Sequence, residues 1–176
     1  MQFCIGRFYN NFKFYLGDNL MLKINLICIG DIKEKFTKDA IDEYKKRISR
    51  FADLRIIELK EHVSRSNNET DIQQSLSKDA EEILKHMKGF SICLDIDGKM
   101  FTSVDFSKKI ENISLSNSEI SFIIGASNGI SESVKIKCNE KISFSKMTFP
   151  HQLMRVIFLE QLYRAFTISH NISYHK

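Results

Sequence analysis

Apolar residues follow two alternating spacings from Met21 onward. Near-continuous apolar runs, typical of strands covered on both faces of a sheet, occupy residues 23–30, 54–59, 90–96, 120–125 and 141–145. Between these runs, apolar residues recur at helical spacing in residues 34–51, 71–88, 103–113, 131–138 and from Pro150 onward. Strands that alternate with helices predict an α/β domain with a mainly parallel sheet and helices on both faces.

The first 20 residues do not continue this pattern. They are rich in aromatic residues, but they lack the unbroken apolar core and the small-residue cleavage site of a signal peptide. The strand pattern begins directly after Met21. We therefore expect residues 1–20 to be an extension outside the domain and residues 21–176 to form a single domain, which is long enough to bury about 70% of its unfolded surface.

The composition is that of an ordinary globular protein, with 43% hydrophobic and 27% charged residues. The net charge of +4 is compatible with an acidic partner such as RNA but does not require one. No apolar run approaches the ~20 residues of a membrane span, so no membrane association is expected. The four cysteines are widely spaced and form no CxxC pair. This spacing argues against a metal site and favours a reducing, cytoplasmic location.

Three loops that follow predicted strands have the composition of a binding site. They read LDIDGK (94–99), IGASNG (124–129) and FSKMTF (144–149), and ligands of parallel sheets bind outside the carboxyl ends of the strands. Gly98, Gly125 and Gly129 allow backbone groups to approach a flat ligand, although glycines at strand ends also simply form turns. The segment after the first strand has only one glycine, so the usual nucleotide-binding signatures are absent. A flavodoxin-like nucleotide binder is therefore disfavoured.

The last predicted helix is apolar on more than one face. It also carries two charged or imidazole pairs four residues apart, His151 with Arg155 and Glu160 with Arg164. The second pair fits either a surface ion pair of about 0.3–0.5 kcal/mol or a functional site. A helix this apolar is either deeply buried or shared with a second subunit.

The segment SFSKMTFPHQLMRVIFLEQLYRAFTISHNISYHK, residues 143–176, resembles the carboxyl-terminal signature of the RlmH family of SPOUT-class methyltransferases. LDIDGK and FIIGASNG resemble the family's two other landmarks, so the resemblance extends from about Met21 to Lys176. It implies a sheet with a carboxyl-terminal trefoil knot, a homodimer, and no metal. The implied reaction moves a methyl group from S-adenosylmethionine to N3 of a pseudouridine in 23S rRNA within the ribosome.

The resemblance also implies which residues hold the cofactor. These are Leu94, Gly125 and the run Phe144, Ser145, Lys146, Met147, Thr148 and Phe149. An adenine ring needs an apolar slot and a few backbone hydrogen bonds, which such loops can supply. The family usually has a second glycine where this chain has Ala126, so a backbone that needed positive φ there would be strained.

The carboxyl-terminal tail is implied to close over the substrate side of the site. Arg164 and Lys176 are expected to contact phosphates, Tyr174 to stack on the target base, and His175 to position that base or accept its proton. The expected chemistry is an in-line displacement without a covalent enzyme intermediate. The alternative is a catalytically inactive RNA- or ribosome-binding protein of the same fold, which the intact loops and tail disfavour.

Overall fold

The computed structural model describes residues 21–64 and 66–175, and residues 1–20, predicted to be an extension, lie outside this range. Ten helices and strands alternate along the described chain, as the apolar pattern predicts. They are β1 (Leu22–Ile29), α1 (Lys35–Ile48), β2 (Ala52–Leu59), α2 (Glu69–His86), β3 (Phe90–Met100), α3 (Ser103–Ser114), β4 (Glu119–Ile124), α4 (Glu132–Lys137), β5 (Glu140–Ser143) and α5 (His151–Ser169).

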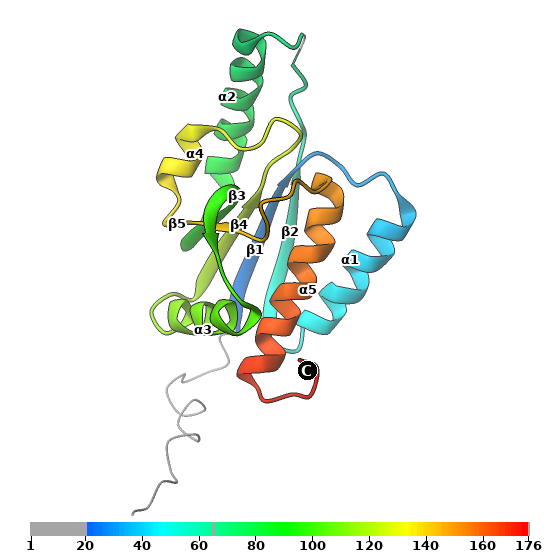
Figure 1. The fold of residues 1–176 in the computed structure, drawn as a ribbon, viewed down its shortest axis with the longest axis vertical. Coiled ribbons are helices and arrows are strands. Elements are labelled where there is room, and N and C mark those ends of the chain that lie inside the picture. The colour runs from blue at the N-terminus through cyan, green and yellow to red at the C-terminus, as the bar shows by residue number, and fades with distance from the viewer. Residues whose placement is uncertain (1–20, 65, 176) are drawn as a thin grey trace, which may run out of the picture.

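All five strands are parallel, in the order β2-β1-β4-β3-β5. Helices α1, α3 and α5 cover one face of the sheet, and α2 and α4 cover the other (Figure 1). The central strands β1 and β4 are therefore buried on both faces, which explains their near-continuous apolar sequences. The predicted α/β class, with helices on both faces of a parallel sheet, is confirmed.

Strand β3 is longer than its apolar run predicts, because its end turns around β5. Leu94 and Lys99 both pair with Ile142 of β5, with a shift of register between them. A side-chain carbon at Gly98 would lie 2.5 Å from the carbonyl carbon of Ile142. The missing side chain at position 98 therefore allows the β3 turn to close on β5, a role that strand-end position alone does not reveal.

Helix α5 lies between α1 and α3 against the sheet (Figure 1). Phe158, Leu159 and Leu162 are completely buried there, which accounts for much of the apolar sequence of this helix. Leu153 nevertheless remains 43% exposed, and Ile157 is half-buried. One apolar strip of α5 is therefore not covered by the described chain.

The helix starts agree with the sequence prediction to within one or two residues. Thr102 caps α3 by accepting a hydrogen bond from the Asp105 N–H at 3.1 Å. Pro150 precedes the first turn of α5 and does not occupy its first position, since its ψ of 130° is extended. In the part of the chain that the structure describes, no helix combines the length and the apolar character that a membrane crossing requires.

Candidate active site

A cavity of about 290 Å³ opens at the carboxyl ends of β4 and β5, beside the part of β3 where the strand turns. All three loops that the sequence singles out contribute to its wall. Seven of the eight residues predicted to hold the cofactor line it, namely Leu94, Gly125, Phe144, Ser145, Met147, Thr148 and Phe149. The eighth, Lys146, is turned aside, and its ammonium donates a 3.2 Å hydrogen bond to the carbonyl of Ile96.

The β4–α4 loop closes tightly on itself at the cavity. A side-chain carbon at Gly125 would lie 2.2 Å from the carbonyl oxygen of Gly129, so only glycine fits at position 125. Gly129 supplies the positive φ of this turn, at 81°. Among the described residues the only non-glycine with positive φ is Asn171. Ala126 does not have positive φ, so the strain that a positive φ would cause there does not arise.

An ion pair that the sequence analysis missed lies in the cavity wall. The carboxylate of Asp95, in the middle of β3 where the strand changes register, is 2.5 Å from the ammonium of Lys135 on α4, and the Asp95 side chain is only 5% exposed. Burial raises the pKa of Asp95, but hydrogen bonds from Lys135 and from the Asp97 N–H outweigh it, and the net pKa is lowered. The two residues are 40 positions apart, so no local pattern could have paired them.

His151 begins α5 and also lines the cavity, while Arg155, one turn later, does not reach it. The Arg155 guanidinium is completely buried. It donates hydrogen bonds to Glu58 and to the carbonyls of Ile29 and Gly30. His151 and Arg155 share a helix face but have different roles. His151 faces the cavity, and Arg155 joins α5 to the ends of β1 and β2.

The tail residues form a separate cluster at the other end of α5. The Glu160 carboxylate accepts hydrogen bonds from Arg164 at 2.5 and 3.0 Å and from the Tyr174 hydroxyl at 3.2 Å. The guanidinium of Arg164 lies 4.8 Å from the centre of the Tyr174 ring and 3.4 Å from Nδ1 of His175. Glu160 therefore binds both Arg164 and Tyr174, and its ion pair with Arg164 is not an isolated surface pair.

Burial and neighbouring groups make the Tyr174 phenol less acidic than usual. Its partial burial and its contacts with Tyr44 and Glu160 raise the Tyr174 pKa to about 12, so the hydroxyl remains a hydrogen-bond donor at physiological pH. The hydrogen bonds to Glu160 raise the pKa of Arg164 further above its usual range. The cluster therefore consists of an Arg164–Glu160 ion pair and a neutral phenol. Lys176 lies outside the described residues.

The cavity and the tail cluster do not meet within one chain. His151 and Arg164 are 13 positions apart on α5, which corresponds to about 20 Å at 1.5 Å per residue. Figure 1 shows the carboxyl terminus at the end of α5 remote from the β5–α5 connection. The structure brings the predicted cofactor residues together and, separately, the predicted catalytic residues Arg164, Tyr174 and His175.

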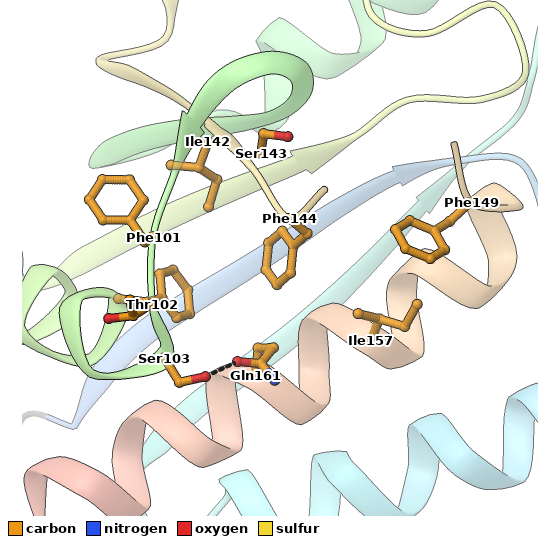
Figure 2. Close-up of a pocket in the computed structure, with 10 residues that line it drawn as sticks. Phe101, Thr102, Ser103, Ile142, Ser143, Phe144, Phe149, Ile157 and Gln161 are labelled. Carbon is orange, nitrogen blue, oxygen red and sulfur yellow. Dashed lines mark hydrogen bonds between the residues drawn. The ribbon is translucent and has the colours of Figure 1, made fainter. Parts of the chain in front are cut away.

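A second cavity of about 290 Å³ lies between these two ends, where α5 faces β5 and the segment that joins β3 to α3 (Figure 2). Ile157 and Gln161 of α5 line one side of it. Phenylalanine rings form much of the remaining wall, namely those of Phe101, Phe106, Phe144 and Phe149. Gln161 accepts a 2.8 Å hydrogen bond from Ser103 and donates one of 2.6 Å to Glu160. This cavity therefore adjoins the cofactor cavity through Phe144 and Phe149 and the tail cluster through Gln161.

The described residues contain no cluster of three or more histidine, cysteine or carboxylate side chains suited to a metal ion. Both cavities are walled largely by apolar side chains, with a few polar or charged groups among them. Such walls bind flat organic ligands by shape and a few hydrogen bonds.

A parallel sheet whose β3 end turns around β5, with a cavity beside that turn and at the ends of β4 and β5, is the architecture of a SPOUT methyltransferase. A family described as "Predicted SPOUT methyltransferase" matches residues 22–175, and the chain belongs to this family. Such enzymes use S-adenosylmethionine as the methyl donor. The chain is therefore a methyltransferase of the SPOUT fold, as the resemblance implies.

Similar proteins point to one branch of the family. The chain is 50% identical over 159 residues to "Ribosomal RNA large subunit methyltransferase H" of Fusobacterium nucleatum, a match that covers 88% of this chain and all of that protein. It is 44% identical over 155 residues to the protein of the same name from Caldicellulosiruptor saccharolyticus, covering 87% of this chain and 99% of that protein. The resemblance to the RlmH family is confirmed.

Among solved structures, a probable methylase family protein from Haemophilus influenzae Rd KW20 superposes with a TM-score of 0.51 at 14% identity. The match covers 90% of this chain and 72% of that chain. At this identity the similarity concerns the fold alone.

Proposed function

We propose that this protein transfers the methyl group of S-adenosylmethionine to N3 of a pseudouridine in 23S rRNA. The observation that carries the proposal is the convergence of three strand-end loops on one cavity, in a chain whose relatives are named for methylation of large-subunit ribosomal RNA.

The cavity fits the adenosine part of the cofactor. Leu94, Met147 and Phe149 provide apolar walls, and the missing side chain at Gly125 lets a flat ring approach the backbone. Ser145 and Thr148 add hydroxyl groups for polar contacts. The cofactor supplies an electrophilic methyl group bonded to a positively charged sulfur. Most of the rate should then come from holding this methyl group and N3 in line.

Only a second chain can bring the tail cluster to this cavity, because about 20 Å of helix separates them within one chain. We infer a homodimer in which the uncovered strips of two α5 helices pack in an antiparallel manner. A two-fold axis at the middle of α5 would set the tail of each protomer against the cavity of its partner. The exposed Leu153 and the phenylalanine-walled cavity at mid-helix give this contact its apolar surface.

The tail residues then act on the RNA from the partner's side. Arg164 is paired with Glu160, but its guanidinium has further N–H groups that can donate to a phosphate, and the Tyr174 ring, held by Glu160, offers a flat face for the target base. His175 is exposed beside Arg164 and helps to orient that base. With a net charge of only +4, the enzyme relies on a preformed ribosomal surface in the cytoplasm, not on electrostatic attraction alone.

The test is methylation of large ribosomal subunits from cells that lack the modification, followed by mass spectrometry of the digested RNA. The expected product is N3-methylpseudouridine with the wild-type protein and none with a Gly125→Arg variant. If the wild-type protein binds S-adenosylmethionine by calorimetry but leaves the RNA unmodified, the inactive RNA-binding protein is the correct interpretation.

A further inference from the structure

His151 is the cavity-lining group whose chemistry the proposed function leaves unused. It occupies the first turn of α5, is half-buried, and forms no hydrogen bond or ion pair within the described chain. The other two ionisable groups of the wall, Asp95 and Lys135, neutralise each other at 2.5 Å. An imidazole without a partner at the mouth of a reaction cavity is free to bind or to accept a proton.

The surroundings of His151 favour its neutral form. Burial is the main cause of its lowered pKa, and the positive charge of Arg155 lowers it further. The carboxylate of Glu61, from the segment after β2, acts in the opposite direction and is the weaker influence. Glu58 is engaged by Arg155 at 2.8 Å. The amino end of α5 also disfavours a cation at this position.

The neighbouring Arg155 cannot take the same role. Its guanidinium is completely buried and bonded to Glu58 and two carbonyls, and an arginine side chain does not give up its proton in proteins. His175 differs from His151 in having a partner already, because its Nδ1 lies 3.4 Å from a terminal nitrogen of Arg164 in the tail cluster.

We propose that His151 accepts the N3 proton of the target base during methyl transfer. This inference rests on the proposed function. The N3 atom forms a bond to the methyl carbon as the carbon–sulfur bond breaks, and that electron pair remains on sulfur. The electrons of the N3–H bond stay on N3, and the proton moves to a ring nitrogen of His151. The imidazolium then returns the proton to water.

His151→Gln tests this assignment in single-turnover methylation of the large subunit, with excess S-adenosylmethionine, over a range of pH. Glutamine keeps the polarity and approximate size of the side chain but cannot act as a base. We expect cofactor affinity within about twofold of the wild type and a rate at neutral pH about a hundredfold lower, the usual scale of general-base catalysis. The loss should shrink at alkaline pH, where N3 ionises without help.

The matched control is His175→Gln, whose loss should be the same at every pH because His175 orients the base. The wild-type rate should also fall in acid through a single ionisation, whose pKa lies below the ordinary histidine value of about 6.5. The pH–rate profile of His151→Gln should lack this ionisation. The ring resonances of His151 in the nuclear magnetic resonance spectrum should report the same ionisation.

Two outcomes would overturn the inference while leaving the proposed function intact. An unchanged rate in His151→Gln would show that the imidazole takes no part, and a loss that is equal at all pH values would show that it only positions the base. If glutamine disturbs cofactor binding, His151→Asn provides the same comparison with a smaller side chain. A wild-type protein that methylates no RNA would instead refute the proposed function itself.

Discussion

Arg155 and Glu58 form an ion pair of 2.8 Å that joins α5 to the end of β2, although 97 positions separate them in the sequence. The Arg155 side chain is fully buried, whereas that of Glu58 is 39% exposed. The other terminal nitrogen of the guanidinium binds the carbonyls of Ile29 and Gly30 at 2.8 and 2.7 Å. This one side chain therefore fixes the start of α5, and with it His151, against the ends of β1 and β2.

Arg155→Met should destabilise the protein by about 3–5 kcal/mol, the scale for removing one partner of a buried, hydrogen-bonded ion pair. The methionine leaves two buried carbonyls and a carboxylate without their donor. Chemical denaturation of the purified protein measures the change. Glu58→Gln is the comparison: it leaves the fully buried guanidinium without its counter-charge, so it should also cost about 3–5 kcal/mol. A loss below about 1 kcal/mol in either variant would show that this ion pair does not hold α5 in place.

The strands, the helices and the three cavity loops could be predicted from the sequence because each depends on local pattern. An apolar run marks a buried strand wherever it pairs, and a glycine-bearing loop after a strand reaches the same edge of a parallel sheet. The Arg155 and Asp95 ion pairs could not be predicted, because their partners are 97 and 40 positions away. The turn of β3 around Ile142 is equally non-local.

The tail illustrates a different limit. Its residue types indicate RNA contacts, and in the structure Arg164, Tyr174 and His175 lie together. Their distance from the cavity depends on the length of α5 and on which end faces the β5 loop. Neither the motif nor its spacing contains that information.

Gly125→Ala should weaken S-adenosylmethionine binding at least tenfold, because the new methyl group would lie 2.2 Å from the Gly129 carbonyl oxygen and force the loop apart. Isothermal titration calorimetry gives the affinity directly. Gly129→Ala is the comparison: its side chain would meet no atom within 4 Å, but its φ of 81° is unfavourable for alanine. That variant should lose about 1 kcal/mol or more of stability and less affinity. The opposite order would refute this assignment of the two glycines.

Stability should increase with pH through the ionisation of His151. The folded state lowers the pKa of this group below the ordinary value of about 6.5, so between the two values the unfolded chain binds more protons than the folded one. The contribution of His151 is therefore complete above pH 6.5 and is lost as the pH falls through the folded-state pKa. Unfolding free energies measured from pH 5 to 7.5 should show a shallower slope in His151→Gln. An unchanged slope would show that His151 titrates normally.

Residues 1–20 should be dispensable, because the family match begins at residue 22 and the relative from Fusobacterium nucleatum is matched along its whole length. A chain that starts at Met21 should keep the thermal midpoint, the cofactor affinity and the oligomeric state of the full chain. Differential scanning fluorimetry, calorimetry and sedimentation measure these three properties. A clear loss in any of them would show that the extension packs on the domain.

Mixing two inactive variants should restore methylation if each site combines the cavity of one protomer with the tail of its partner. One variant carries Gly125→Arg, which blocks the cofactor cavity at its tightest point. The other is truncated after residue 173 and so has neither Tyr174 nor His175. Each homodimer alone should be inactive. A mixed dimer has one intact cavity facing one intact tail, so random exchange at equal amounts should give about a quarter of wild-type activity.

Different affinity tags on the two chains isolate the mixed dimer and confirm that both variants assemble. Continued inactivity of the isolated mixed dimer would mean that cavity and tail must belong to the same chain, and the antiparallel α5 arrangement would be wrong.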